Sequence, residues 1–539
     1  MLCAGLLWSA VAVAQNLNPT VEVTNLYARE ASGIEKPSQL REIPDSLTRF
    51  NLDFDYSVNE TPYQGAYEFT PYLVQPKPSA RPLTEGKLYL RLGAGYTLHP
   101  EFAAVWTPVR TRRFRLNVFG DHSSHIGNYH QIVLNTQGRF EPDGSARKGI
   151  RMRSAVGTDA LFNWGGGILR ADLQYNNLVA TDISRGDAMH HVLRASARVQ
   201  KVPGTGGIDY ELGSKVAMIW APFGLLQETH SVTDARMGAR LFRRYFTLGL
   251  QMETLSQPEG GVCSFQLSLP RYTHSGKRFS FSAGLKAAFM VRSVSTFIPT
   301  REGYIFPDVQ ASLALIPDYL SLYAAVTGGN ELASYDTLLG ADPFIAWADW
   351  YSDVKKQRIL ASLGLRGNIG KRFYYDVKGG YSWLESTWLW GYNPGTYVPA
   401  VGYAGPIHAL FAVAEAGWRN HFLNVEGYVK YLYTLNTPSI LTTGVALFQP
   451  APLSARGKVF YNWGHRLSAG LTLEARSEME SRLGRLPGYL DLGMEASFQM
   501  SSRTGLWLKL GNLLNQPIQR VPFYAEKGMY FTAGISYNL

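Results

Sequence analysis

The sequence of 539 residues has no run of the roughly 20 unbroken apolar residues that a membrane-spanning helix needs, apart from a shorter one at its N-terminus. Charged residues are scarce, at 17%, where soluble domains typically have about 25%. There are only two cysteines. The lack of a long apolar run argues against a helical membrane protein. Scarce charge beside 13% aromatic residues is instead typical of membrane β-barrels.

Residues 1–14 have the composition of a secretory signal peptide, with an apolar core that ends in the small residues Ala12 and Ala14. Removal of this segment would take Cys3 with it. Cys263 would then be the only cysteine, which excludes an intramolecular disulfide in the exported chain. The net charge of +10 would suit nucleic acid, but export, abundant tyrosine and the lack of a basic helix make anionic lipid headgroups or an acidic partner the expectation.

Residues 15–85 differ in character from the rest and are set apart by prolines at 76, 78 and 82. We interpret them as an N-terminal periplasmic or lumenal segment, followed by a barrel over 86–539. In the barrel region, segments of alternating apolar and polar residues recur, and alternating residues of a strand point to opposite faces. The pattern predicts about 22 strands, at 87–96, 101–108, 113–121, 150–162, 167–179, 190–202, 207–220, 232–242, 245–256, 262–271, 278–291, 305–315, 319–327, 357–368, 372–383, 407–418, 422–434, 452–463, 466–477, 488–500, 504–512 and 528–539.

The connections between these strands alternate between short turns and longer links, which include 122–149, 328–356, 384–406, 435–451 and 513–527. Bacterial outer-membrane barrels have short periplasmic turns, long external loops and an even number of antiparallel strands. A soluble propeller or sandwich would also have many strands. It would not explain why short turns alternate with long links. We therefore predict an all-β transmembrane antiparallel up-and-down barrel.

The two faces of the predicted strands differ in polarity. Leu169 and Leu173 lie on the opposite face from Arg170 and Asp172, and a charge on the lipid side would cost about 2–4 kcal/mol near the midplane. The charged face must therefore line the interior. We expect opposite charges on neighbouring inward positions to pair, with ion selectivity as the alternative interpretation.

The C-terminal stretch carries the most specific pattern in the chain. Leu506, Leu508 and Leu510 alternate with polar or small residues, an Asn512-Leu513-Leu514-Asn515 turn follows, and a last alternating strand runs from Gly528. This ending resembles that of TonB-dependent receptor barrels, in the style common in Bacteroidetes, although Leu539 stands where that family usually has an aromatic residue. The resemblance implies a receptor barrel of the outer membrane in a Gram-negative bacterium, in contact with its lipids and lipopolysaccharide.

Members of that family carry an N-terminal plug domain and a short box that binds TonB, and neither is evident in the roughly 70 residues before the first predicted strand. The resemblance thus leads to two hypotheses. The first is a receptor or transport role for an unidentified solute, with TonB coupling left open. The second is a barrel that does not transport and serves as an accessory subunit of an outer-membrane complex for barrel assembly, secretion or a lipoprotein partner.

Two predicted external loops are rich in aromatic residues. Aromatic planes can stack on sugars or apolar ligands, or they can pack the loops against each other and anchor them at the headgroups. A wide lumen would leak if empty, so we also expect inward side chains, folded-in loops such as 328–356, the segment before the barrel or a partner to fill it. The candidate ligand contacts are Trp347, Trp350, Tyr351, Trp388, Trp390 and Tyr392.

Three histidines follow the third predicted strand, at His122, His125 and His130. Imidazoles this close can hold a transition metal, but the spacing matches no standard zinc motif, and surface loops often carry histidine. No nucleophile accompanies them, and no phosphate loop or nucleotide fingerprint is present. We therefore expect no enzyme and no cofactor.

Basic residues gather at the predicted periplasmic turns. They suit the phosphates of inner-leaflet lipids, and they also suit an acidic periplasmic protein or lipoprotein. The candidate docking residues are Arg112, Arg113, Arg243, Arg244, Lys277 and Arg278.

Overall fold

The computed structural model describes residues 87–539, with the exception of 97, 183–185, 202–207, 222–226, 242–243, 295–299, 318, 340–343, 345–353, 371, 442–443 and 465. The predicted signal peptide, 1–14, and the segment 15–85 lie outside the described residues. No helix among the residues described has the length and apolar character needed to cross a bilayer.

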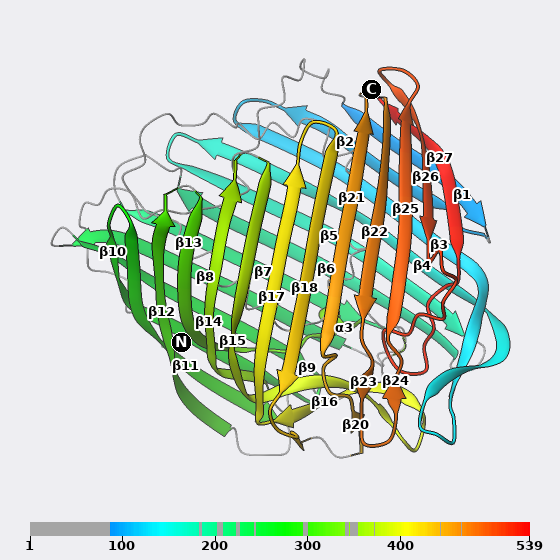
Figure 1. Cartoon of the computed structure of the whole chain (residues 1–539). Coiled ribbons are helices and arrows are strands. Elements are labelled where there is room, and N and C mark those ends of the chain that lie inside the picture. The colour runs from blue at the N-terminus through cyan, green and yellow to red at the C-terminus, as the bar shows by residue number, and fades with distance from the viewer. Residues whose placement is uncertain are drawn as a thin grey trace.

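A closed antiparallel sheet of 22 strands forms a transmembrane β-barrel (Figure 1). Its first eleven strands are β1 (Leu88–Tyr96), β2 (Glu101–Arg110), β3 (Phe114–Leu134), β4 (Phe140–Trp164), β5 (Gly167–Asp182), β6 (Gly186–Lys201), β7 (Asp209–Trp220), β8 (Gln227–Leu241), β9 (Arg244–Gln257), β10 (Gly260–Ser275) and β11 (Phe279–Val294). The other eleven are β12 (Thr300–Ile316), β13 (Leu320–Glu331), β14 (Lys355–Ile369), β15 (Phe373–Asn393), β17 (Ile407–Arg419), β18 (Leu423–Thr434), β21 (Leu453–Trp463), β22 (Leu467–Arg476), β25 (Tyr489–Gln499), β26 (Thr504–Gly511) and β27 (Tyr530–Asn538).

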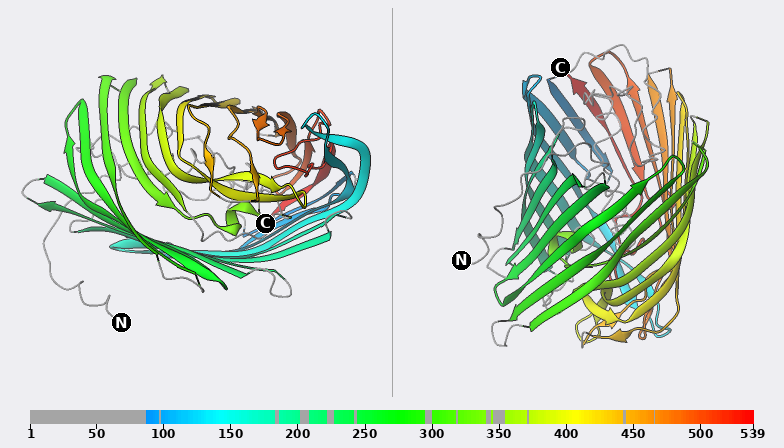
Figure 2. Two further views of the ribbon diagram at one scale, coloured as in Figure 1. Left: turned by 90° about the horizontal axis from the view of Figure 1, so that it is seen from below. Right: turned by 90° about the vertical axis from the view of Figure 1, so that its left-hand side faces the viewer.

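Four of the smaller elements, β16, β20, β23 and β24, lie at one end of the barrel, the lower end in Figure 1, and helix α3 lies above them. We call the lower end the external end, and the end with the C-terminus the periplasmic end. The small elements are β16 (Val398–Gly405), β19 (Ser439–Ile440), β20 (Ala446–Leu447), β23 (Met479–Glu480), β24 (Arg485–Leu486) and the one-turn helix α3 (Tyr335–Leu338). Seen from this end, the barrel has an elongated cross-section that these segments partly cross (Figure 2).

The first and last strands pair and so close the sheet. β1 and β27 are antiparallel over eight residue pairs, from Tyr89 with Asn538 to Tyr96 with Phe531. Closure removes the open edge at which an incomplete sheet would expose unpaired backbone groups to lipid.

The strand faces follow the polarity that the sequence predicts. On β27, Phe531 is 45% exposed and Ile535 54% exposed, while Thr532 between them is 0% exposed. On β26, Leu506 is exposed on the outer face and Trp507 is buried on the inner face. The apolar residues therefore form a lipid-facing outer surface, and the polar ones line the lumen.

Inward charges of opposite sign pair across the strands, as the sequence predicts. Lys201 Nζ lies 3.1 Å from Asp209 Oδ1, and Arg198 Nη1 lies 3.1 Å from Glu211 Oε1. Such pairing lets charged side chains sit on the inner wall without an unpaired charge in a low-dielectric position.

Each of the 22 predicted strands corresponds to one barrel strand, but two predicted loops are wrong. Residues 122–149 are mostly strand, because β3 and β4 continue past the barrel wall and turn only near 135–139. Residues 384–406 are a second extended hairpin, in which β15 pairs with β16 from Thr387 and Ala404 to Asn393 and Val398. Both hairpins lie at the external end.

Candidate functional site: the closed external mouth

Segments that are far apart in the sequence pack together across the external mouth of the barrel. We call the assembly of residues 332–339, the β15–β16 hairpin and the last loop, 512–529, the mouth cap. One apolar cluster joins all three to the inner wall, which contributes Val192, Ile219, Leu255, Val262 and Met290. From the mouth cap it includes Tyr335 and Leu338, Trp388 and Trp390, and Val521 and Tyr524. The mouth is thus closed by an apolar core of its own.

Helix α3 is held to the inner wall by a carboxylate that takes up its free amino-terminal donors. Glu228 of β8 is 1% exposed, and its Oε1 accepts hydrogen bonds from Ser334 Oγ at 2.9 Å and from the Tyr335 backbone N–H at 2.8 Å. Oε2 of the same carboxylate accepts from Gln257 Nε2 at 2.9 Å. A helix terminus has backbone N–H groups without internal partners, and an anion satisfies them well.

A second anchor on this segment is an ion pair. Arg194 of β6 donates from Nε to both carboxylate oxygens of Asp336, at 3.0 and 2.9 Å. Both side chains are only about a quarter exposed, at 26% and 22%. A bidentate arginine–carboxylate pair fixes orientation as well as distance, so the segment 332–339 is held against β6 and β8.

The last loop begins with the Asn512–Asn515 turn noted in the sequence. Both asparagines have positive φ, of 44° and 49°, a conformation that asparagine adopts more readily than most residues. Asn512 Nδ2 donates to the carbonyls of Gln516 and Lys527, at 2.7 and 3.2 Å, and Asn515 Oδ1 accepts from the Met529 backbone N–H at 2.9 Å. The two residues therefore tie the ends of the loop together.

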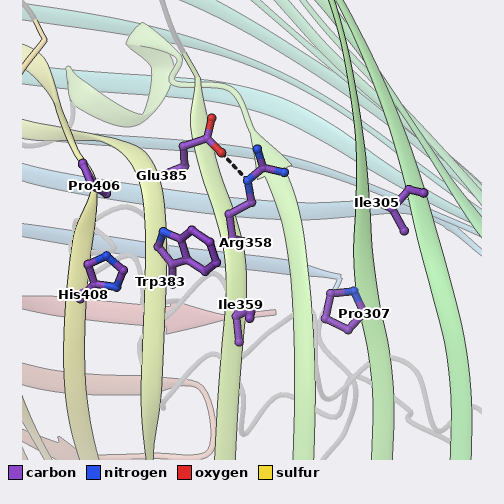
Figure 3. A pocket seen from close by; sticks show the side chains of 8 residues that line it. All are labelled: Ile305, Pro307, Arg358, Ile359, Trp383, Glu385, Pro406 and His408. Atoms are coloured by element: carbon purple, nitrogen blue, oxygen red, sulfur yellow. Dashed lines mark hydrogen bonds and ion pairs between the residues drawn. The ribbon is translucent and has the colours of Figure 1, made fainter.

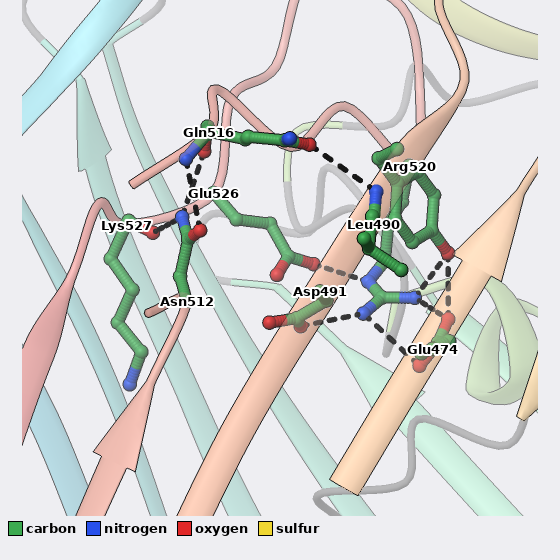
Figure 4. Close-up of polar contacts among 9 residues, drawn as sticks. Glu474, Leu490, Asp491, Asn512, Gln516, Arg520, Glu526 and Lys527 are labelled. Carbon is green, nitrogen blue, oxygen red and sulfur yellow. Dashed lines mark hydrogen bonds and ion pairs between the residues drawn. The ribbon is translucent and has the colours of Figure 1, made fainter. Parts of the chain in front are cut away.

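Arg520 fastens the middle of this loop to the barrel wall (Figure 4). Its guanidinium contacts Glu474 of β22, donates to Tyr489 Oη at 2.6 Å, and lies 3.6 Å from Asp491 of β25. Within the loop it donates to Glu526 at 2.7 Å. One guanidinium thus joins Glu474 and Asp491 of the wall to Glu526 of the loop.

Two wall arginines hold the loop backbone from other directions. Arg476 of β22 donates to the carbonyls of Gln519 and Arg520, at 2.7 and 2.9 Å. Arg151 of β4 donates to the Ala525 carbonyl at 2.8 Å, and its guanidinium lies 3.7 Å from the centroid of the Tyr524 ring. These contacts satisfy backbone carbonyls that would otherwise be buried without partners.

Lys527 occupies the base of the loop in an unfavourable position for a charge. Its Nζ lies 3.0 Å from His99 Nε2 and 3.6 Å from the centroid of the Tyr530 ring. Burial, and next to it the charge of Lys509, lowers the pKa of Lys527 to about 7. Glu101 and Glu526 oppose this shift. The charge of Lys527 is thus sensitive to pH near neutrality.

Three of the six predicted aromatic ligand contacts lie in buried packing positions. Trp388 and Trp390 are each 7% exposed and Tyr392 is 1% exposed. Tyr392 contacts Phe140 and Phe523, with ring centroids 5.4 and 5.3 Å apart. The other three predicted contacts, Trp347, Trp350 and Tyr351, lie outside the described residues.

The three histidines do not converge. His122 points to the outer face and its Nδ1 is 2.8 Å from Ser154 Oγ, whereas His125 is buried with its Nδ1 2.6 Å from Tyr129 Oη. His130 is exposed farther along β3. No group of three histidine, cysteine, aspartate or glutamate side chains suited to a metal ion occurs among the described residues.

The described members of the predicted docking set lie at the periplasmic end. Arg112 and Arg113 are exposed in the turn between β2 and β3, and Lys277 and Arg278 are exposed in the turn between β10 and β11. Arg244 begins β9, and Arg243 lies outside the described residues.

The sequence reasoning missed the anchors of the mouth cap. Arg194 lies in the predicted strand 190–202, where strand alternation could have marked it as lumen-facing. Glu228 lies before the predicted strand 232–242, because β8 begins five residues earlier than predicted, at Gln227. Their partners in the loops carry no comparable pattern, because Ser334, Asp336 and Arg520 are ordinary polar loop residues in the sequence.

No protein-family model matches the sequence, and no curated protein matches it either. Solved structures do share the fold. The FrpB iron transporter from Neisseria meningitidis has a TM-score of 0.59 at 10% identity, covering 84% of this chain and 82% of that chain. The copper transporter OprC has a TM-score of 0.57 at 12% identity, and the match covers 84% of this chain and 80% of that chain. The siderophore receptor PirA from Acinetobacter baumannii has a TM-score of 0.57 at 9% identity, with the same two coverages. The chain therefore is a β-barrel with the fold of TonB-dependent receptors.

Proposed function

We propose that the chain is an outer-membrane receptor that admits a solute through its lumen when the mouth cap opens. The observation that carries this proposal is how the mouth is closed. The mouth cap is joined to the barrel wall by the apolar cluster and mainly by side-chain contacts, such as those of Arg194 with Asp336 and of Arg520 with Tyr489. Residues 332–339 and 512–529 take no part in the strand pairing of the barrel, which ends at Glu331 on β13 and at Gly511 on β26. The mouth cap can therefore separate from the wall while the 22 strands stay paired.

The polar character of the anchors favours movement. Charged groups that separate at a water-filled mouth are rehydrated, which offsets part of the lost contact energy, and a typical charged hydrogen bond contributes only about 1.5–3 kcal/mol. The similar solved structures are named as transporters of iron and copper and as a siderophore receptor. That likeness supports a receptor or transport role, with the solute left open.

Single-channel recording in planar bilayers tests the proposal. We expect the wild-type barrel to be closed for most of the time. The double variant Arg194→Gln with Arg520→Gln should open more often, because it removes one anchor from each of two mouth-cap segments. Arg112→Gln is the matched control, since this arginine is exposed in a periplasmic turn far from the mouth cap along the chain.

Conductance that rises only in the anchor variant supports a gated pathway. A double variant that is folded, has lost protection of the mouth cap from protease and still conducts no ions would overturn the transport role. In that case copurification with fixed envelope partners would favour the accessory-subunit hypothesis.

A further inference from the structure

Arginines form a row across the inner wall of the barrel near its periplasmic end. Arg110 of β2 lies opposite Arg115 of β3, and Arg170 of β5 lies opposite Arg198 of β6. Leu161 of β4 stands between the two pairs, opposite both Arg115 and Arg170. Directly opposite residues of an antiparallel sheet share one face, so the row crosses five neighbouring strands. We call the four arginines the arginine row.

The arginine row faces the lumen. Phe162 and Leu173 point to the other face of β4 and β5, and they are 41% and 48% exposed on the lipid side. Leu161 and Arg170 therefore point inward. Arg170 and Arg198 stand three residues from the periplasmic ends of their strands, which corresponds to about 10 Å along the chain. The row thus lies just inside the periplasmic mouth, at the opposite end of the barrel from the mouth cap.

Two arginines of the row have no ion-pair partner. Arg358, near the external end, shows a paired arrangement, in which its Nε contacts the carboxylate of Glu385 (Figure 3). In contrast, the side chains of Arg115 and Arg170 make no hydrogen bond or ion pair with any described residue, and Arg170 is exposed. Like charges that lie opposite each other on a sheet repel. The row therefore favours an added negative charge.

The carboxylates around the row offset only part of its charge. Glu211 of β7 serves two arginines, since its Oε1 lies 3.1 Å from Arg198 Nη1 and its Oε2 lies 3.7 Å from Arg236 Nη1. Two further carboxylates stand one inward position along β4 and β5, and both accept hydrogen bonds from neutral side chains, Asp159 from Asn117 at 2.9 Å and Asp172 from Ser196. The row and Arg236 thus amount to five arginines beside three carboxylates.

We propose that the arginine row binds solutes that carry two or more phosphate or carboxylate groups. One anionic group bridges Arg170 and Arg198, whose Cβ atoms are about 5 Å apart as directly opposite residues. A second group reaches Arg115, which is two strands and so about 10 Å from Arg170. Guanidinium groups bind phosphate and carboxylate alike through paired hydrogen bonds. The place of this site on a solute pathway rests on the proposed function, whereas the binding itself does not.

Isothermal titration of the full chain in detergent with tripolyphosphate, at low ionic strength, tests the site. We expect Arg170→Gln to weaken binding by about tenfold, the effect of one lost charged hydrogen bond, and a second substitution, Arg115→Gln, to weaken it further. Glu211→Gln should strengthen binding, because a competing carboxylate is gone. Lys148→Gln, at an exposed lysine near the external end of β4, is the control and should change nothing.

The opposite signs expected for Arg170→Gln and Glu211→Gln separate binding from misfolding, which would weaken binding in both. Equal affinity in wild type and in the double variant Arg115→Gln with Arg170→Gln would overturn the proposal. So would equal affinity for tripolyphosphate and inorganic phosphate, because the row would then recognise a single anionic group. A photocrosslinker at position 161 that captures an envelope protein would also overturn it, since a protein would then occupy the row.

Single-channel recording separates this inference from the proposed function. In the mouth-cap variant Arg194→Gln with Arg520→Gln, tripolyphosphate on the periplasmic side should block the conductance. Addition of Arg170→Gln should raise the blocking concentration about tenfold. Tripolyphosphate that binds in titrations to a barrel that never conducts would overturn the transport role alone. Conductance in a barrel that does not bind tripolyphosphate would overturn the arginine-row site alone.

Discussion

Arg194 on the barrel wall and Asp336 on helix α3 are 142 residues apart in sequence, yet the arginine Nε lies 2.9 Å from the aspartate Oδ2. This contact holds the segment 332–339, which belongs to an external connection, against the lumen side of the barrel wall. It stands beside the Glu228 contacts with Ser334 and Tyr335, which hold the same segment at its start. Two wall residues from β6 and β8 therefore decide where this connection lies.

Loss of this ion pair should loosen α3 without disturbing the barrel. We expect Asp336→Asn to reduce the local stability of residues 332–339 by about 1–3 kcal/mol, the range for a charged hydrogen-bonded pair. Hydrogen exchange of this segment should become faster while exchange in β6 and β8 stays slow. Arg170→Gln, on the same face of the sheet but exposed, is the control. Unchanged exchange in the segment would show that the contact contributes nothing.

Trp390 should be essential to the mouth cap and dispensable for the barrel. Truncation of a buried tryptophan to alanine typically costs about 3–5 kcal/mol, and Trp390 is 7% exposed within the cluster that joins all three segments. We expect Trp390→Ala to make the mouth cap sensitive to protease while the folded barrel keeps its electrophoretic mobility. Trp463→Ala is the matched control, since that tryptophan is 67% exposed. A protease pattern identical to wild type would contradict the prediction.

The barrel strands were predictable because their pattern is local. Alternation of apolar and polar residues along one strand, such as Phe531 and Ile535 against Thr532, requires no knowledge of the rest of the chain. The external ends of the strands were less predictable. The alternation becomes weaker where β3 and β4 leave the lipid, because neither face there must be apolar, and the sequence therefore suggested a loop in place of a hairpin.

The same cause explains the misjudged histidines. His122 and His125 were expected in one loop, where neighbouring side chains can converge. In the continuous strand β3 an odd separation places them on opposite faces. The mouth-cap anchors were hidden for a different reason, since an inward arginine such as Arg194 looks the same in sequence whether it meets water, another wall residue or a loop.

The turn at the base of the last loop gives a prediction about backbone conformation. Asn515 has φ of 49° and accepts a hydrogen bond from Met529, so Asn515→Ala loses both the tolerance for this conformation and the acceptor. We expect a loss of about 1–2 kcal/mol in the stability of the loop 512–529. Asn515→Gly keeps the conformation and should be milder. Hydrogen exchange of residues 516–526 measures both, and an alanine variant no worse than the glycine variant would rule out backbone strain as the cause.

Lys527 makes closure of the last loop depend on pH. Its pKa is about 7 in the closed loop, against 10.5 for a free lysine. Between pH 7 and 10.5, Lys527 is protonated in an opened loop and neutral in the closed loop. The closed state therefore gains stability as pH rises through this window. Below pH 7 the amine is protonated in both states, and the stability of closure no longer depends on pH through this group. Glu101, Glu526, Lys509, Arg151, His99 and Tyr530 surround the amine and set the size of the effect.

We therefore expect hydrogen exchange of residues 516–526, corrected for intrinsic rates, to slow between pH 7 and 8.5 by at most about tenfold per pH unit. Lys527→Met keeps the approximate length of the side chain and removes the charge, so the loop of this variant should be at least as protected at pH 7 as wild type is at pH 8.5. Residues of β22 serve as the internal control, because their strand pairing does not involve this amine. Protection that falls with rising pH, or a Lys527→Met loop that keeps the wild-type pH profile, would show that another group controls closure.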